Sequence, residues 1–305
     1  MRVLVTGATG YVGSRVATRL AARGFTVSGL VRKAARGAAL PDGVVPLVAD
    51  LRDIDALVGA AQGVDAVVHT AFASHGTDWF AAVELERELT EAWARALQGT
   101  SKPLLVSNGT GFYGNAGGHF LQEDEPVPPN NPAAVRALAT RAATTTPGVH
   151  GIELRLASFV HGYGGSVFLP VLVAAARRTG RSIYVGEGKN RLSAVHVEAV
   201  ANAYVAALDH GRPGHIYHVA ADDSPSMREL AEAIAIGTGA KAESVTGEEA
   251  AEVLDPFTAM FLALDNGLSS RKARCELAWS PSGWPTLLWD VAHGSYADVS
   301  ASRVR

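Results

Sequence analysis

The sequence predicts an α/β protein built on a doubly wound parallel sheet with a smaller C-terminal region, and two observations lead to this prediction. Short runs rich in valine, leucine and isoleucine alternate along the first half of the chain with segments whose apolar residues recur at helical spacing. Most of the short runs are continuously apolar, which is typical of strands buried on both faces. Such alternation indicates βαβ units, whose strands lie parallel in one sheet.

The expected elements follow one another regularly as far as residue 157. Strands are predicted at residues 3–6, 26–31, 44–48, 66–69, 103–107 and 151–156. Helices are predicted between them at residues 11–23, 54–62, 79–97 and 133–143. We therefore expect residues 1–157 to form the core of the sheet.

The alternation becomes irregular after residue 157. Predicted helices at 167–178, 197–209 and 227–236 mix with isolated strands at 183–185 and 215–219. The sequence has no linker, repeat or low-complexity stretch between its halves. We expect residues 158–305 to form mainly a region that caps the core and binds substrate, with some elements returning to the core.

The bulk properties are those of a soluble globular protein. Apolar residues make up 48% of the 305-residue chain and charged residues 19%, which are ordinary values. The net charge of −3 argues against a nucleic-acid partner, because phosphate binding needs a basic face. One cysteine, Cys275, permits neither an internal disulfide nor zinc-finger spacing. The longest apolar stretch, 167–176, is too short to span a bilayer, and no leader segment is recognisable. We expect a cytoplasmic protein that does not bind membranes.

A glycine motif, TGATGYVG at residues 6–13, joins the first predicted strand to the first helix. Gly7 permits the tight turn, Gly10 lets the backbone approach a pyrophosphate, and Gly13 lets helix and strand pack closely. The positive end of the helix dipole then faces the phosphates. The motif predicts a dinucleotide site, with expected contacts from Gly7, Thr9, Gly10, Tyr11, Val12 and Gly13.

The end of the second predicted strand carries cations where an NAD site usually carries an acid. That acid lies about 20 residues after the glycines and bonds the ribose 2′-hydroxyl. Arg32 and Lys33 stand there instead, and an arginine can fork onto a 2′-phosphate. Charge-assisted bonds of about 1.5–3 kcal/mol correspond to a roughly 10- to 100-fold preference. We therefore expect NADP(H) as the cofactor, the alternative being a solvated basic turn.

Further segments join the glycine motif in a resemblance to a known family. Asp50-Leu51 follows the third strand, HTAF stands at 69–72, SNGTGFYG at 107–114 and RLASFVHG at 155–162. These segments resemble those of the extended and atypical short-chain dehydrogenase/reductases, which include NAD-dependent epimerase/dehydratases. The resemblance covers nearly the whole chain and implies a Rossmann-type fold. It also implies contacts to adenine from Asp50 and Leu51, to the ribose side from Thr70, Ala71 and Phe72, and to the nicotinamide from Ser158 and Phe159.

The sequence departs from this family at its catalytic residues. Family reductases carry Tyr-x-x-x-Lys in the helix after the fifth strand, where the tyrosine donates a proton and the lysine lowers its pKa. The two positions here are Ala133 and Ala137. A shift of one residue would put Arg136 in the lysine's place, still without a proton donor. The family's catalytic serine falls near Gly109 or Thr110.

Three hydroxyl side chains are candidates to replace the missing acid. Thr110 comes first by position, followed by Ser107 and Tyr113. The alternatives are that Ser107 caps a strand end and that Tyr113 only packs. His119 and His161 are weaker candidates, the first expected in an exposed loop and the second expected to be structural or next to the cofactor. General acid catalysis contributes about 10²–10⁴-fold, so proximity to a nicotinamide can still give reduction without it.

A ketone next to a phenol or enol can also supply its own proton, which resembles what is inferred for tyrosine-less reductases of polycyclic polyketides. We therefore expect an NADPH-dependent ketoreductase of polyketide or antibiotic biosynthesis, with its proton from substrate, water or a substitute side chain. Late aromatic and apolar residues are candidates to line a pocket for a flat substrate, core packing being the alternative: Phe257, Met260, Phe261, Trp279, Trp284 and Trp289.

Two other functions fit the same sequence. One is a redox-neutral epimerase or dehydratase with tightly bound NAD, and the other is a non-catalytic NADP(H) sensor. The expected partner is a small apolar or aromatic ketone. The histidines show no metal-ligand spacing, so no metal is expected. Helices 79–97 and 133–143 occupy positions where many relatives dimerise, which leaves monomer and homodimer open.

Overall fold

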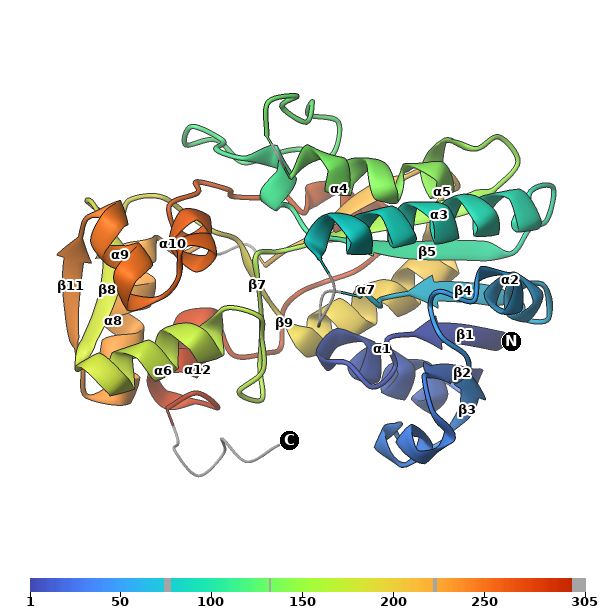
Figure 1. Ribbon diagram of the computed structural model, residues 1–305, viewed down its shortest axis with the longest axis horizontal. Helices are drawn as coiled ribbons and strands as arrows, with labels where there is room; N and C mark the ends of the chain where they lie inside the picture. The colour runs from blue at the N-terminus through green and yellow to red at the C-terminus, as the bar shows by residue number, and fades with distance from the viewer. Residues whose placement is uncertain (74–77, 132, 222–223, 298–305) are drawn as a thin grey trace.

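The computed structural model of the chain describes residues 1–73, 78–131, 133–221 and 224–297. A seven-stranded parallel sheet forms its centre, in the order β10-β6-β5-β4-β1-β2-β3 (Figure 1). Strand order therefore reverses beside β1, and in such sheets ligands bind where the order reverses, outside the carboxyl ends of the strands. The strands are β1 Arg2–Thr6, β2 Thr26–Val31, β3 Val44–Val48, β4 Ala66–His69, β5 Pro103–Asn108, β6 His150–Leu156 and β10 Ile216–Val219.

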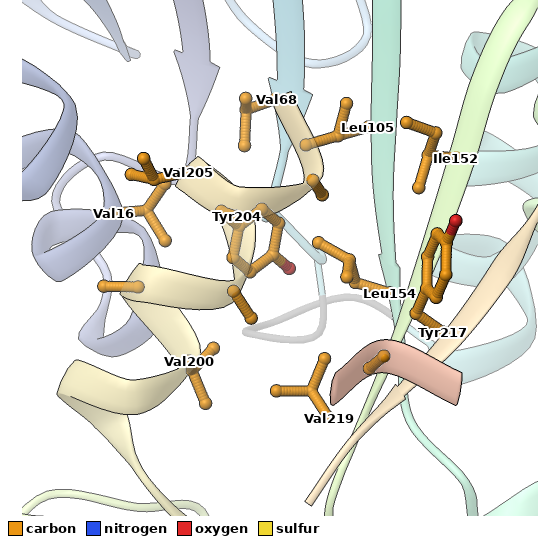
Figure 2. Close-up of a cluster of buried hydrophobic side chains, with 14 of the residues drawn as sticks. Val16, Val68, Leu105, Ile152, Leu154, Val200, Tyr204, Val205, Tyr217 and Val219 are labelled. Atoms are coloured by element: carbon orange, nitrogen blue, oxygen red, sulfur yellow. The ribbon is translucent and has the colours of Figure 1, made fainter. Parts of the chain in front are cut away.

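Helices cover both faces of this sheet, which confirms the doubly wound α/β fold. One face carries α1 (Tyr11–Ala22) and α7 (Val197–His210), and the other carries α2 (Ile54–Gln62) and α3 (Trp79–Leu97) (Figure 1). Neighbouring strand residues point to opposite faces. Val3 and Val5 accordingly belong to the core on the α1 side and Leu4 to the core on the α3 side. Figure 2 shows the α1 side, where Tyr204 of α7 lies among side chains of β4, β5 and β6.

The helix expected at 133–143 is two short helices, α4 (Ala134–Ala139) and α5 (Arg141–Thr145). Thr140 stands between them and is fully buried. Its hydroxyl accepts a hydrogen bond from Asn108 Nδ2 at 2.9 Å. This interaction with the end of β5 holds the break against the sheet, and apolar periodicity alone gave no sign of it.

Residues after 157 form a second lobe and also return to the sheet. The lobe has its own apolar core and a two-stranded parallel sheet of β8 and β11. A second two-stranded sheet, β7 with β9, runs between lobe and main sheet (Figure 1). By contrast, α7, β10 and α11 pack within the core of the main sheet. The remaining elements are η1 Ala34–Ala39, η2 Gly111–Tyr113, β7 Phe159–His161, α6 Leu169–Thr179, β8 Arg181–Val185, β9 Ala194–His196, α8 Met227–Thr238, β11 Lys241–Val245, α9 Gly247–Val253, α10 Pro256–Leu262, α11 Arg271–Glu276 and α12 Leu287–His293.

The described residues include no helix with the length and apolar character needed to traverse a bilayer.

Trp93 tests the packing of α3 on the sheet. Its side chain is fully buried, its indole N–H donates to Leu57 O at 3.1 Å, and its ring lies edge-on to His69. We expect Trp93→Ala to lower the free energy of unfolding by about 3–5 kcal/mol. Trp289→Ala is the control, because Trp289 is 52% exposed, and should change it by less than about 0.5 kcal/mol. Urea unfolding followed by circular dichroism measures both, and equal losses would contradict this packing.

Candidate active site

The glycine loop between β1 and α1 leaves no room for a side chain at Gly7 or Gly13. Gly7 has a φ of +71°, and a Cβ there would lie 2.8 Å from Thr70 Oγ1. A Cβ on Gly13 would lie 2.1 Å from the Gly7 carbonyl oxygen. Gly10 begins α1 with extended backbone, and among the described residues no side chain caps this helix end. Uncapped N–H groups at a helix N-terminus bind anions, so the loop fits a pyrophosphate.

Side chains at the ends of β1 and β4 tie the next expected cofactor segment to this loop. Thr6 Oγ1 and His69 Nδ1 are 2.7 Å apart, Thr70 Oγ1 donates to Thr6 O at 2.7 Å, and Ala71 N donates to Thr6 Oγ1 at 3.3 Å. Burial lowers the pKa of His69 to about 3, so its imidazole is neutral at physiological pH. The structure thus brings Thr70 and Ala71 directly against the glycines.

Arg32 and Lys33 follow β2, whose neighbour in the sheet is β1. Both side chains are exposed, and within the described part of the chain neither has a hydrogen-bond or ion-pair partner. Asp50 follows β3, and its carboxylate accepts from Arg52 N at 2.9 Å. Leu51 is partly buried against the core on the α3 side. The two cations therefore lie at the same edge of the sheet as the glycine loop, with their charges uncompensated.

The three predicted catalytic hydroxyls have very different surroundings. Ser107 donates to His69 O at 2.6 Å and is hydrogen-bonded to the Tyr204 hydroxyl, so it is engaged on the α7 side of the sheet. Tyr113 accepts from the Arg155 guanidinium and lies 3.0 Å from His218 Nε2. Burial raises the pKa of Tyr113 to about 12. Thr110 is also buried, but its hydroxyl has no partner among the described residues.

Arg136 is held beneath the expected cofactor segment by an acid from another helix. Its guanidinium is ion-paired with Glu86 of α3, whose side chain is almost fully buried. It also lies over the Phe72 ring, 4.3 Å from the centroid. Burial lowers the pKa of Arg136 to about 10, which leaves it charged at neutral pH. Ala133 and Ala137 pack against the main core, so α4 contributes a neutralised cation and apolar contacts here.

A second buried pair continues this polar layer across the sheet. Arg155 Nε donates to Glu153 Oε1 at 2.9 Å, and Asn108 Nδ2 donates to the same carboxylate oxygen at 3.2 Å. The neighbouring His218 N donates to Glu123 Oε1 at 2.9 Å. Glu153 and Arg155 both lie on β6, but Asn108, His218 and Glu123 come from two other strands and a loop, so sequence reasoning missed the arrangement. The available signal was two opposite charges inside the apolar strand IELRL.

Aromatic side chains of the C-terminal lobe approach the Thr110 loop. Phe261 stacks on Phe168 with centroids 3.8 Å apart and meets Phe159 edge-on at 6.4 Å. A Cβ on Gly111 would lie 3.9 Å from Phe261 Cε2, so this group borders the loop. Phe257 also stacks on Phe168, with ring centroids 6.2 Å apart. We call Phe159, Phe168, Phe257 and Phe261, with the exposed Met260, the aromatic wall.

The other expected site residues lie apart from the aromatic wall or only at its edge. Trp279 donates to Ala199 O at 2.8 Å within the main core, and Trp284 stacks on His196. Trp289 is exposed on α12. Ser158 directly precedes Phe159, and its hydroxyl is buried without a partner in the described residues. His119 is exposed and pairs with Glu125, as expected for a loop.

Comparisons with known proteins agree with this architecture. The model of the NAD dependent epimerase/dehydratase family matches residues 3–220. An uncharacterized protein of Schizosaccharomyces pombe is 34% identical over 97% of this chain and 100% of its own. The 4-hydroxy-2-methyl-3-oxo-4-farnesyl-3,4-dihydroquinoline-1-oxide ketoreductase of Stigmatella aurantiaca is 29% identical over 80% of this chain and 75% of its own. The structure of the UDP-glucose 4-epimerase of Thermus thermophilus in complex with NAD aligns with a TM-score of 0.75 and 23% identity, covering 97% of this chain and 99% of that one. The expected family is thereby confirmed: the chain belongs to the NAD dependent epimerase/dehydratase family.

Proposed function

We propose that the protein is an NADPH-dependent ketoreductase that reduces a ketone on a flat, polycyclic, polyketide-like substrate without a catalytic tyrosine. The observation that carries the proposal is the exposed, unpaired Arg32 beside an intact glycine loop, within the part of the chain that the structure describes. A free cation at this place favours a dinucleotide with a 2′-phosphate. The similarity to a ketoreductase of Stigmatella aurantiaca supports the reaction class.

Different residues of the site would bind different parts of the dinucleotide. The loop from Gly7 to Gly13, including Thr9, Tyr11 and Val12, would hold the pyrophosphate, and Arg32 and Lys33 would hold the 2′-phosphate. Asp50 and Leu51 would contact adenine, Thr70, Ala71 and Phe72 the ribose side, and Ser158 and Phe159 the nicotinamide. A bound nicotinamide supplies hydride to the substrate carbonyl.

No described side chain near the proposed reacting carbonyl is a good acid at neutral pH. The Tyr113 hydroxyl is held by Arg155 and His218, and burial raises its pKa to about 12. Burial also lowers the pKa of His218 to about 3, which keeps this imidazole neutral. The Thr110 hydroxyl is buried without a hydrogen-bond partner among the described residues, and an aliphatic alcohol is a much weaker acid than a phenol. We therefore propose that the proton comes from an enol or phenol of the substrate, or from water.

The aromatic wall is evidence for the proposed apolar, flat substrate. Phe257 is 58% exposed and Met260 is 59% exposed, so both present apolar surface next to the ring stack. Burying such side chains against a ligand contributes about 1.5–3 kcal/mol each. A polycyclic ketone whose rings lie on this wall would direct its carbonyl toward the Thr110 loop.

The competing candidate is a redox-neutral epimerase or dehydratase that keeps NAD bound, which the family membership and the likeness to an epimerase favour. Such chemistry relies on a base that the Ala133 and Ala137 positions lack. NAD⁺ retained through purification would favour this candidate over the ketoreductase.

Cofactor preference is tested by reversing the charge at Arg32. We expect Arg32→Asp to raise the Kd for NADPH by roughly 10- to 100-fold, because a charge-assisted bond is lost. The Kd for NADH should stay unchanged or fall. Fluorescence titration measures both, with Arg36→Asp on the exposed η1 as the matched control. An unchanged Kd for NADPH in the Arg32→Asp variant would contradict the assignment of NADP(H) as the cofactor.

The source of the proton is tested by removing two of the three candidate hydroxyls, those of Thr110 and Tyr113. We expect Thr110→Ala to lower kcat by no more than about tenfold, since orientation is lost but no acid is removed. Tyr113→Phe should lower the free energy of unfolding, because Arg155 loses a hydrogen-bond acceptor. The folded variant should keep its kcat. Stopped-flow NADPH oxidation gives kcat for each variant. A thousandfold loss in either folded variant would identify that hydroxyl as the acid.

The substrate class is tested on a panel of ketones followed by NADPH oxidation. Polycyclic aromatic ketones should be reduced in preference to small aliphatic ones. We expect Phe257→Ser and Met260→Ser each to raise KM for the aromatic ketone by roughly 10-fold or more. Ile236→Ser, which changes an exposed apolar residue of α8, is the control and should leave KM unchanged. An unaltered KM in both wall variants would contradict the wall as the substrate surface.

A further inference from the structure

Tyr11 reaches out of the glycine loop to the segment that follows β7. It is the first residue of α1, and its hydroxyl donates to Gly162 O at 2.8 Å. Gly165 lies flat against the same ring, because a Cβ there would be 2.2 Å from Tyr11 Cε2. The loop that fits the pyrophosphate is thus in direct contact with the chain just beyond Ser158 and Phe159.

Tyr296 of the C-terminal lobe is hydrogen-bonded to the same segment. Gly162 N donates to the Tyr296 hydroxyl at 3.0 Å, and that hydroxyl donates to Gly165 O. Arg177 of α6 donates to the Tyr296 carbonyl oxygen at 2.8 Å. Tyr296 therefore joins the segment to helix α6 of the lobe.

A buried histidine–aspartate hydrogen bond at the end of β7 and a serine fix the ends of this segment. His161 Nδ1 lies 3.1 Å from Asp290 Oδ2 of α12. The other carboxylate oxygen of Asp290 accepts from Ser295 N and Oγ at 2.8 and 2.9 Å. Gly164 N in turn donates to Ser295 Oγ at 2.8 Å.

The segment has three consecutive residues with positive φ. Gly162, Tyr163 and Gly164 have φ values of +119°, +54° and +70°. A left-handed conformation is unfavourable for a tyrosine and persists when its surroundings determine it. The Tyr163 ring lies against the Arg15 guanidinium of α1 at 4.2 Å and the His196 ring at 5.6 Å. Tyr11 and Tyr296 hold the glycines beside it, so the segment takes its shape from both parts of the molecule.

We infer that Tyr11 and Tyr296 are positioning residues that act as one latch: they hold residues 162–165 between the dinucleotide loop and the C-terminal lobe. Cofactor binding at the loop then steadies the lobe, and with it the aromatic wall, relative to the nicotinamide. The inference rests on the proposed dinucleotide site. It assigns the two phenol groups a part in transmitting cofactor binding, without contact to substrate.

Hydrogen exchange measured by mass spectrometry on the full chain, with and without NADPH, tests the latch. In the unmodified protein NADPH should slow exchange both in the glycine loop and in residues 286–297. In Tyr11→Phe and in Tyr296→Phe the loop should still be protected, but the slowing at 286–297 should be lost. The double variant should match either single variant, because two parts of one unit are not additive.

Tyr217→Phe is the matched control. It removes a hydroxyl that donates to Glu276 at 3.0 Å in the main core, away from the latch, and should keep both protections. In the latch variants KM for the ketone should rise more than the Kd for NADPH. Gly165→Ala, which pushes a methyl group against the Tyr11 ring, should reproduce their exchange pattern if a tyrosine variant fails to fold.

The outcomes separate the latch from the function on which it rests. NADPH protection of the loop alone in the unmodified protein, or protection at 286–297 that survives both tyrosine variants, would overturn the latch and leave the cofactor site standing. If neither NADPH nor NADH slows hydrogen exchange in the glycine loop, both the proposed function and the latch are wrong.

Discussion

The arrangement of the candidate site depends on the buried ion pair between Arg136 and Glu86. Two charges taken out of water are tolerated only when each has its partner, and removal of one partner of such a pair destabilises a protein by about 3–5 kcal/mol. The pair fixes α4 to α3 below Phe72. The carbonyl oxygen of Arg136 also accepts from Asn108 Nδ2 at 3.1 Å, which ties α4 to the end of β5. The loop that carries Thr110 starts at that point.

The same pair limits what α4 can do chemically. A cation next to a phenol lowers the pKa of that phenol when its field is uncompensated. Arg136 has its charge balanced by Glu86 at close range and is turned toward α3. An arginine held in this way supports the Phe72 ring and the fold of the helix, and the adjacent carboxylate offsets part of the field that it would exert on an acid. This favours the proposal that the proton is not supplied by a tyrosine–cation pair.

Local patterns predicted most of the fold, because each strand and each glycine is determined by its immediate sequence. The strand of residues 26–31 and the glycine positions are examples, and both follow from burial on two faces and from close backbone approach. The break at Thr140 could not be predicted, since it depends on Asn108, which is 32 residues away. Glu86 was not identified for the same reason: as one acid within an amphipathic helix, it becomes a buried partner only when α4 packs beside α3. Ser107 lies next to the last residue of β5, and its distant partner Tyr204 could not be seen in the sequence.

The charged side chains of the site therefore fall into two regions, one in which the charges are paired and one in which they are not. Below the reacting region they cancel in pairs, Glu86 with Arg136 and Glu153 with Arg155, and the buried imidazoles of His69 and His218 are neutral because burial lowers each pKa to about 3. At the far end of the proposed dinucleotide site, Arg32 and Lys33 remain exposed and uncompensated within the described residues. Under the proposed function, such a site would recognise an anionic cofactor at its rim and would offer an apolar surface without net charge to the substrate carbonyl. Such a surface suits a neutral aromatic ketone, whose binding depends on apolar contact, better than a substrate that carries its own charge into the lobe.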